Sequence, residues 1–182
     1  MRTPMNIALL QGSPNKTGST ALLCKQFTQG ARASGHEVDR IDLAELSIAP
    51  CTGCVRCGYG AHPCVQHDDM RIVRQTILNA DMVVFATPLY YYGMSAQLKI
   101  VIDRFCADNI AIESKRLKAA LISPAWNADS WTFDALVLHY QTLCRYLHMQ
   151  DKGMILGYGC GTPGMTKHSS AMNEAYELGA SL

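Results

Sequence analysis

Residues 7–20 read Ile-Ala-Leu-Leu-Gln-Gly-Ser-Pro-Asn-Lys-Thr-Gly-Ser-Thr, an apolar run that ends in Gly, Ser, Asn and Thr before a helical pattern begins. The pattern predicts a strand, a hydroxyl-rich loop and the N-terminus of a helix. Such a junction gathers unpaired backbone N–H groups and the positive end of the helix dipole, which together favour an anion. The stretch therefore predicts a phosphate site. A loop in which Ser19 or Thr20 only caps the helix is the alternative.

The glycine spacing narrows the class of phosphate compound. A P-loop has four residues between its first glycine and Gly-Lys-Ser/Thr, whereas five residues separate Gly12 from Gly18 here, and Ser19 stands in place of the lysine. Hydrolysis of ATP or GTP is therefore not expected. The loop after this strand also lacks a dinucleotide fingerprint, so we expect a ligand that ends in one phosphate rather than ATP or a dinucleotide.

Strand and helix patterns alternate along the whole chain, which predicts an α/β fold with a five-stranded parallel sheet and helices on both faces. Residues 82–86 form the continuous apolar run of a central strand. The segments 44–67 and 107–117 are expected to be a long loop and a connector. The expected strands are residues 5–11, 36–43, 81–87, 118–123 and 153–158, and the expected helices are residues 18–34, 68–80, 95–106, 130–147 and 168–178, the last ended by Gly179.

Three segments carry a resemblance to a known family. Gly-Ser-Pro-x-x-x-Gly-x-Thr at residues 12–20 resembles the FMN phosphate loop of the flavodoxin-like NADPH-dependent FMN reductase family. Residues 87–99, followed by Ile-Asp-Arg at 102–104, resemble its flavin-ring loop and the helix after it. Cys51-x-x-Cys54-x-x-Cys57 with Cys64 resembles the cysteine motif of the iron-sulfur flavoprotein branch. The resemblance implies a three-layer sandwich with strand order 2-1-3-4-5.

In that strand order, ligands bind at the switch point between the first and third strands. The phosphate loop and the tyrosine loop follow these two strands, so both motifs converge on one crevice. The candidate phosphate ligands are Ser13, Asn15, Thr17, Gly18, Ser19 and Thr20. Family members often carry Arg at the position of Asn15 and Asn at that of Ser19.

The tyrosine loop is expected to hold the flavin ring, with backbone N–H groups at its polar edge and an aromatic side chain on its face. The alternative is that these tyrosines are surface or interface aromatics. In family members the loop after the fourth strand reaches the same crevice, where Trp126 would wall the dimethylbenzene side, unless it is a buried structural residue. The candidate ring contacts are Pro88, Leu89, Tyr90, Tyr91, Tyr92, Gly93, Ala125 and Trp126.

Four of the eight cysteines fall within residues 51–64. Clustering of this degree suggests shared ligation by Cys51, Cys54, Cys57 and Cys64. The candidates for this loop are a 4Fe-4S cluster, zinc or free thiols. Because the segment starts at the same sheet edge as the flavin, a cluster there could exchange single electrons with FMN. Cys24, Cys106 and Cys144 lie in helical patterns and are expected to be small buried hydrophobic residues.

Sixteen basic and fifteen acidic residues give a net charge of +1 without a basic block. This balance favours small-molecule partners over nucleic acid or a membrane surface. The length of 182 residues suits one domain over residues 1–182. Since no leader-like or membrane-spanning apolar run occurs, we expect a cytoplasmic protein.

The resemblance implies an FMN-dependent oxidoreductase with NAD(P)H as co-substrate and a small-molecule acceptor. A flavodoxin-like electron carrier or a redox sensor is the alternative, but flavodoxins are strongly acidic and this chain is nearly neutral. No catalytic side chain is expected, because the flavin itself is the electron sink. The resemblance and the aromatic run at residues 90–92 also predict a homodimer or a dimer of dimers.

Overall fold

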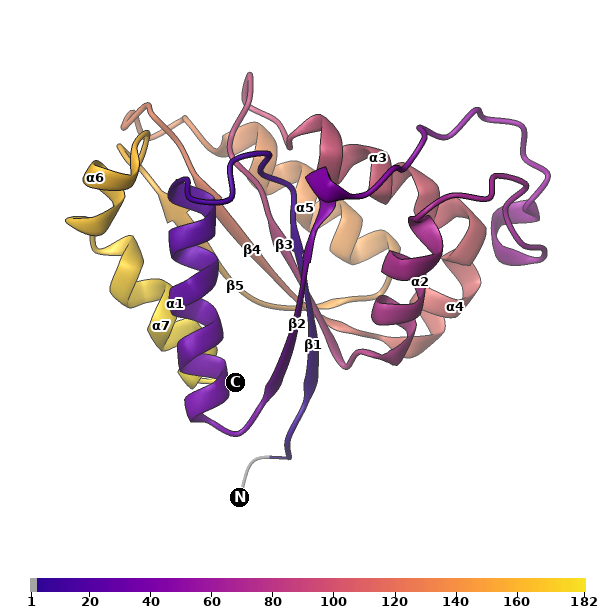
Figure 1. The fold of residues 1–182 in the computed structure, drawn as a ribbon, viewed down its shortest axis with the longest axis horizontal. Coiled ribbons are helices and arrows are strands. Elements are labelled where there is room, and N and C mark those ends of the chain that lie inside the picture. The colour runs from indigo at the N-terminus through magenta and orange to yellow at the C-terminus, as the bar shows by residue number, and fades with distance from the viewer. Residues whose placement is uncertain (1–2) are drawn as a thin grey trace.

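A five-stranded parallel sheet lies at the centre of the computed structural model, which describes residues 3–182 (Figure 1). The order β2-β1-β3-β4-β5 confirms the predicted topology. Gln11 at the end of β1 lies opposite Asp42 of β2 and Ala86 of β3, so these strands end level at one edge. The strands are β1 (Asn6–Gln11), β2 (Glu37–Asp42), β3 (Met82–Ala86), β4 (Lys118–Pro124) and β5 (Gln150–Gly157).

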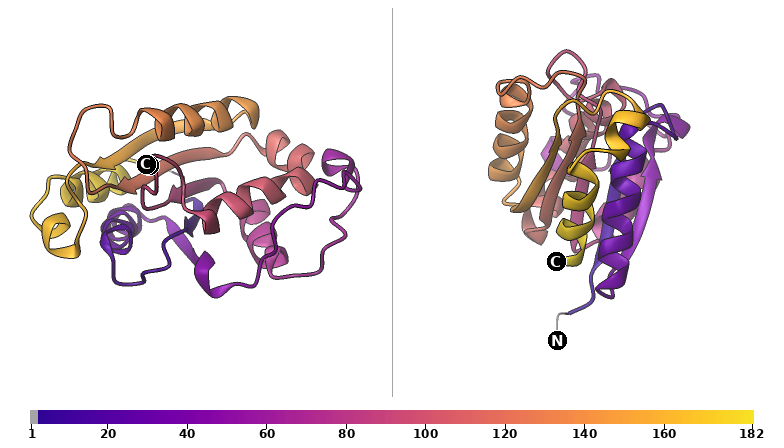
Figure 2. Two further views of the ribbon diagram at one scale, coloured as in Figure 1. Left: turned by 90° about the horizontal axis from the view of Figure 1, so that it is seen from above. Right: turned by 90° about the vertical axis from the view of Figure 1, so that its left-hand side faces the viewer.

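Helices cover both faces of the sheet, with α5 on one side and α1 and α7 on the other (Figure 2). Alternate side chains of a strand point to opposite faces, so Ile7 and Leu9 pack toward α1 and α7 while Ala8 and Leu10 pack toward α2, α3 and α5. The helices are α1 (Ser19–Ala33), α2 (Met70–Asn79), α3 (Ala96–Arg104), α4 (Asn109–Lys115), α5 (Asp134–Tyr146), α6 (Pro163–Lys167) and α7 (Ala171–Ala180).

Three expectations about the secondary structure are wrong. The connector expected at residues 107–117 is helical, comprising the 3₁₀ turn η3 (Phe105–Asp108) and α4. Helix α4 buries only Ile112, so it shows no apolar periodicity in the sequence. Helix α5 begins at Asp134 rather than near residue 130, and β5 begins at Gln150 rather than at residue 153 because its first residues are polar and exposed.

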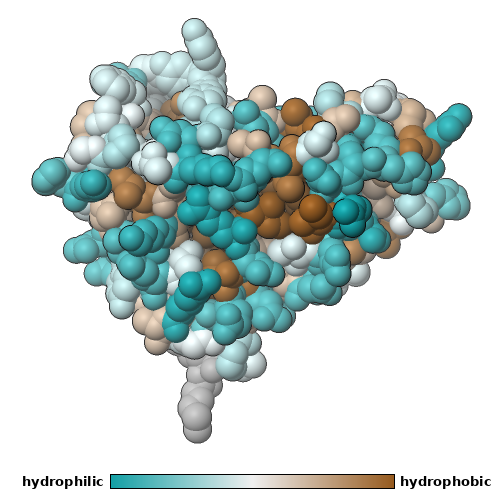
Figure 3. Space-filling model, in the orientation of Figure 1, coloured by the Kyte–Doolittle hydropathy of each residue, from teal (hydrophilic) through white to brown (hydrophobic). Residues whose placement is uncertain are grey.

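The long loop expected at residues 44–67 is confirmed, with two short 3₁₀ turns, η1 (Leu43–Glu45) and η2 (Gly58–Gly60). It runs away from the sheet and extends past α3 toward α4 (Figure 1). The face seen in Figure 3 is mostly hydrophilic, with an apolar area between η1 and α2. Within residues 3–182, no helix is long and apolar enough to cross a membrane.

Helices α1 and α7 approach each other through two glycines. A Cβ on Gly30 would lie 2.0 Å from the carbonyl oxygen of Tyr176, and one on Gly179 would lie 2.2 Å from that of Phe27. Gly179 therefore does not end the last helix, as the sequence pattern suggested, but lies inside it at the crossing. Since backbone atoms oppose both glycines, a side chain at either position must push the helices apart.

Replacing Gly30 with alanine should lower the free energy of unfolding by about 1–3 kcal/mol, because the added methyl group overpacks the crossing. Gly164→Ala in α6 is the matched control, since its Cβ would meet Thr162 Oγ1 only at 3.8 Å. The control should change stability by less than about 0.5 kcal/mol. Urea unfolding followed by circular dichroism measures both variants, and a Gly30 variant as stable as the control would contradict the close packing.

Candidate functional site

Ser95 ties the loop after β1 to the loop after β3. Its hydroxyl donates to the carbonyl oxygen of Gly12 at 2.7 Å, and its backbone N–H donates to Thr87 Oγ1 at 2.9 Å. The same hydroxyl accepts from the N–H of Leu98 at 3.4 Å and so caps α3. A Cβ on Gly12 would lie 2.7 Å from Ser95 Oγ, so only glycine permits this approach. The two predicted ligand loops are therefore locked together at one edge of the sheet.

The loop after β1 is shaped by its own side chains. Asn15 Oδ1 accepts from the N–H of Thr17 at 3.1 Å, and Ser13 Oγ accepts from the N–H of Asn15 at 3.2 Å. Lys16 pairs with Glu45 of η1. Gly18 occupies the N-cap of α1, and within the described chain no side chain caps this helix. The capping alternative is therefore wrong, and the first N–H groups of α1 remain free to meet an anion.

Ser19 supplies an independent sign of a ligand. The residue is 9% exposed, and its Oγ finds no hydrogen-bond partner among residues 3–182. Thr20 beside it is also buried. A buried hydroxyl without a partner costs about 1–3 kcal/mol. The donor set of free helix N–H groups plus buried hydroxyls, with no acid in the first turn, fits a phosphate.

Gln11 is a polar residue that sequence reasoning missed. It is the last residue of β1 and is fully buried, and both atoms of its amide lack a partner in the described part of the chain. It lies on the sheet face covered by α1, the face of Ile7 and Leu9. The signal was present in the sequence, since an amide at the end of an otherwise apolar strand needs a partner.

The tyrosine loop is a tight hairpin that projects above β3 (Figure 1). Tyr90 and Gly93 exchange two backbone hydrogen bonds of 3.1 Å. Between them, Tyr91 and Tyr92 adopt φ angles of +45° and +64°, a left-handed conformation that costs about 1–3 kcal/mol in a residue other than glycine. Tyr91 is fully exposed, and the ring of Tyr92 lies 5.1 Å from that of Trp131. Strain of this kind accumulates where a loop serves a ligand.

The loop after β4 is the third loop at the C-terminal edge of the sheet. The N–H of Leu89 donates to the carbonyl oxygen of Pro124 at 3.2 Å, which joins this loop to the tyrosine hairpin. Ala125 is buried and donates to Gly157 at 2.9 Å. Trp126 is 71% exposed, so the alternative of a buried structural tryptophan is wrong. The phosphate loop, the hairpin and this loop therefore surround one region of the C-terminal sheet edge.

The cysteine loop encloses a separate small cavity of about 90 Å³. Five thiols line it: Cys51, Cys54, Cys57, Cys64 and Cys106. Across residues 3–182, no three His, Cys, Asp or Glu side chains converge in the geometry of a metal site. The prediction that Cys106 is a buried hydrophobic residue is wrong, because it is half-buried and faces the loop, where burial and the neighbouring Cys51 and Cys57 raise its pKa.

The other two helical cysteines behave as predicted. Burial raises the pKa of Cys24 to about 12 and that of Cys144 to about 11, so neither thiol ionises near neutrality. Cys160 is buried and donates to the hydroxyl of Ser169 at 3.3 Å.

The cysteine cavity and the flavin edge lie at opposite ends of α3. The tyrosine hairpin precedes the first turn of this helix, whereas Arg104 and Cys106, at and just after its end, line the cavity. Nine residues at 1.5 Å each separate the ends by roughly 13 Å. The loop starts at the flavin edge, as predicted, but its thiols lie away from it.

The fold and these loops define a flavodoxin-like protein of the FMN-binding kind. The family model of the NADPH-dependent FMN reductases matches residues 5–155, and the chain belongs to that family. A protein of Bacillus subtilis named as an NAD(P)H-dependent FMN-containing oxidoreductase is 25% identical over 181 residues, which cover 96% of each chain.

Iron-sulfur flavoproteins are also among the relatives. One from Archaeoglobus fulgidus is 36% identical over 93 residues, 51% of this chain and 42% of that protein. One from Methanocaldococcus jannaschii is 34% identical over 101 residues, 55% of this chain and 51% of that protein. The chain thus spans about half the length of these relatives.

Solved structures share the fold. An NAD(P)H:quinone oxidoreductase from Methanothermobacter marburgensis superposes with a TM-score of 0.79 at 15% identity, over 98% of this chain and 96% of that one. An FMN-dependent NADH-azoreductase from Bacillus anthracis, solved in complex with FMN, gives a TM-score of 0.74 at 12% identity, over 97% and 98% of the chains. At these identities the likeness establishes the flavodoxin-like fold.

The strained hairpin predicts that Tyr91→Asn stabilises the protein without FMN by about 1 kcal/mol, because asparagine tolerates the left-handed conformation and an exposed ring has no packing to lose. Tyr146→Asn is the control, since Tyr146 is also an exposed tyrosine but is helical. The free energy of unfolding of this control should fall by no more than about 0.7 kcal/mol. Urea unfolding compares the two, and a Tyr91 variant that is less stable than wild type would show that the conformation is not strained.

Proposed function

We propose that this protein is an FMN-dependent oxidoreductase that takes electrons from NAD(P)H and passes them to a small-molecule acceptor such as a quinone. The observation that carries the proposal is the buried, unpartnered hydroxyl of Ser19 at the uncapped start of α1. The names of its relatives support the reaction class. Bound FMN would supply the hydride-accepting ring, and the chain's own residues bind and orient it.

In this proposal the phosphate lies at the first turn of α1. Ser19 and Thr20 donate to it with the free N–H groups of the helix, while Ser13, Asn15, Thr17 and Gly18 hold the loop in place. The buried amide of Gln11 offers a further donor and acceptor below the loop. Two buried hydroxyls and a helix dipole act together on one dianion, which is why the site needs no lysine.

The ring lies between the other two loops. Pro88, Leu89, Tyr90, Tyr91, Tyr92 and Gly93 bound its polar edge and one face, and Ala125 and Trp126 bound its far side. The N–H groups of Leu89, Tyr90 and Gly93 already form hydrogen bonds within the protein. The exposed tip of the hairpin and its aromatic rings are therefore the part of the ring site that can adjust to the flavin. Exposed aromatic rings at 90, 91 and 126 give a flat apolar surface suited to a flavin or a quinone.

We further propose that the cysteine loop holds a 4Fe-4S cluster through Cys51, Cys54, Cys57 and Cys64. Support comes from their common cavity and from the names of the iron-sulfur flavoprotein relatives. Backbone donors already face two of the sulfurs: Gly53 N–H lies 3.5 Å from Cys51 Sγ, and the Arg56 N–H lowers the pKa of Cys54. Binding requires the thiols to close around the metal, since they do not yet converge.

We also propose a homodimer or a dimer of dimers that covers the flavin edge. The exposed rings of Tyr90, Tyr91, Trp126 and Trp131 leave an apolar surface there in the single chain. Light scattering at micromolar concentration should give a mass of about 40 kDa or a multiple of it, twice the 20.0 kDa chain or more. A monomer, with or without FMN, would contradict the assembly.

Replacing Ser19 with alanine tests the FMN site. The variant should bind FMN roughly 10- to 100-fold more weakly, because a hydrogen bond to a charged group is worth about 1.5–3 kcal/mol. Its stability without FMN should stay the same or rise, because an unsatisfied buried hydroxyl is removed. Ser170→Ala is the control, since that serine also lies at the start of a helix but is exposed.

Fluorescence titration with FMN and urea unfolding provide the two readouts. An unchanged dissociation constant in the Ser19 variant would place the phosphate elsewhere. For the reaction, wild-type protein loaded with FMN should oxidise NADH or NADPH over many turnovers with a quinone. One reduction per flavin without turnover would instead indicate an electron carrier.

A further inference from the structure

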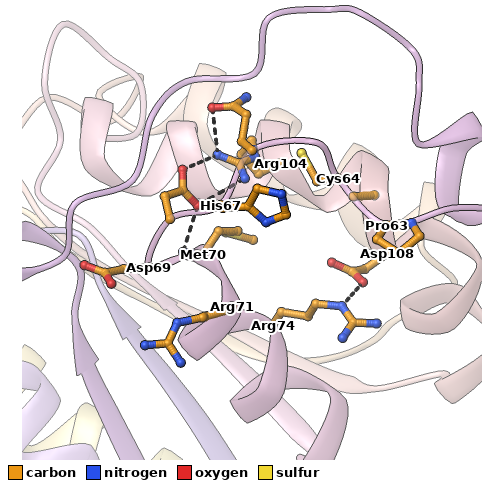
Figure 4. Close-up of a pocket in the computed structure, with 12 residues that line it drawn as sticks. Pro63, Cys64, His67, Asp69, Met70, Arg71, Arg74, Arg104 and Asp108 are labelled. Carbon is orange, nitrogen blue, oxygen red and sulfur yellow. Dashed lines mark hydrogen bonds and ion pairs between the residues drawn. The ribbon is translucent and has the colours of Figure 1, made fainter.

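Arg104, the last residue of α3, lies buried beneath the cysteine loop with an exposure of only 3%. Its Nη1 donates to the carbonyl oxygen of Ala49 at 2.8 Å and to Asp68 Oδ2 at 2.7 Å, and its Nη2 donates to Asp68 Oδ1 at 3.2 Å. Figure 4 shows Arg104 with some of these hydrogen bonds as dashed lines. One side chain therefore binds the two residues at which the cysteine loop leaves and re-enters the body of the protein.

The two ends of the loop are also bound to each other. Asp68 Oδ2 accepts from the N–H of Ala49 at 3.0 Å, and Gln66 Nε2 donates to the carbonyl oxygen of Pro50 at 3.2 Å. Asp68 Oδ1 accepts from the N–H of Met70 and so fixes the start of α2. Arg104 and Asp68 thus hold together the two ends of the cysteine loop, which form a short stem. The residues between Pro50 and Gln66 form a loop whose ends cannot separate while the pair is intact.

Arg104 also faces the thiols. It lines the small cysteine cavity and a second cavity of about 420 Å³ on the other side of Cys64, which Figure 4 shows. Burial acts to lower the pKa of Arg104, but Asp68 and the side chain of Cys64 beside it more than offset this and raise it. Its buried Nε has no hydrogen-bond partner within the part of the chain that the structure describes. A charged donor is therefore left over on a side chain that lies beside the sulfur of Cys64.

We propose that Arg104 is the positioning residue of the cysteine site: it closes the loop stem through Ala49 and Asp68 and offers its remaining N–H donor to the sulfur of Cys64. The closing of the loop stem by Arg104, which we call the clamp, depends only on the contacts described. The donor function toward Cys64 rests on the proposed cluster. A guanidinium beside a thiolate-bound metal centre neutralises negative charge and donates to sulfur, which stabilises the more negative, reduced state.

An ordinary Arg–Asp ion pair is the competing explanation, and the chain contains another such pair close by, although its arginine is more exposed. Arg74 pairs with Asp108 in the wall of the larger cavity, but it contacts neither loop end and does not line the cysteine cavity (Figure 4). Arg74→Gln is therefore the control for the loss of an Arg–Asp pair at this place. Arg104→Lys keeps the charge but loses the two-pronged contact, and Arg104→Gln loses both.

The first measurement is hydrogen exchange of the full chain loaded with FMN but without metal. Amides of residues 50–67 should exchange at least tenfold faster in Arg104→Lys than in wild type or Arg74→Gln, while FMN content stays the same. Equal exchange in all three proteins would overturn the clamp. If the lysine variant fails to fold, Asp68→Asn, which weakens the same pair from the other side, takes its place with the same expected result.

The second measurement follows anaerobic reconstitution with iron and sulfide. Arg104→Gln should lose iron faster than wild type during gel filtration, and the cluster that it retains should have a lower midpoint potential, which a purely structural pair would not change. A potential equal to that of wild type and of Arg74→Gln would overturn the donor function. If wild-type protein binds no iron, the cluster proposal and the donor function fall together, while the exchange experiment still decides the clamp.

Discussion

The buried hydroxyl of Ser95 is the contact on which the arrangement of the flavin edge depends. The hydroxyl donates to the carbonyl oxygen of Gly12 and accepts from the N–H of Leu98, which caps the start of α3. The backbone N–H of the same residue donates to Thr87 Oγ1. A parallel sheet brings the ends of β1 and β3 side by side, but it does not fix the loops that follow. Ser95 does so within a core that excludes water, where such hydrogen bonds are strong. Gly12 is required because any side chain there would displace the hydroxyl.

Around Ser95, several polar groups lack hydrogen-bond partners among residues 3–182, and two residues hold strained backbones. The Ser19 hydroxyl and the Gln11 amide are buried without partners in the described chain, α1 begins without a cap, and Tyr91 and Tyr92 hold left-handed backbones. Each feature costs stability in the protein alone. That these groups lie together at one sheet edge is what a site preorganised for an anionic, flat ligand requires. A bound phosphate would satisfy the donors that folding leaves free.

Much of the fold, and the position of the two candidate ligand loops at one sheet edge, could be predicted from local patterns. The apolar runs at 7–10 and 82–86, each followed by a loop of small or aromatic residues, give the central strands and both ligand loops. The roles of Arg104 and Cys106 could not be predicted, because their partners lie 36 or more residues away in the chain and only the folded α3 brings them under the cysteine loop. Gly179 looked like a helix end because local rules cannot register its contact with Phe27.

We propose that FMN binds with its phosphate at the first turn of α1, between loops that Ser95 holds together. A crystal structure of the purified protein saturated with FMN tests it most directly. We predict phosphate oxygens within hydrogen-bond distance of Ser19 Oγ and of the first backbone N–H groups of α1, with the ring between the tyrosine hairpin and Trp126. A phosphate bound anywhere else, or a ring on the far side of the sheet, would contradict it.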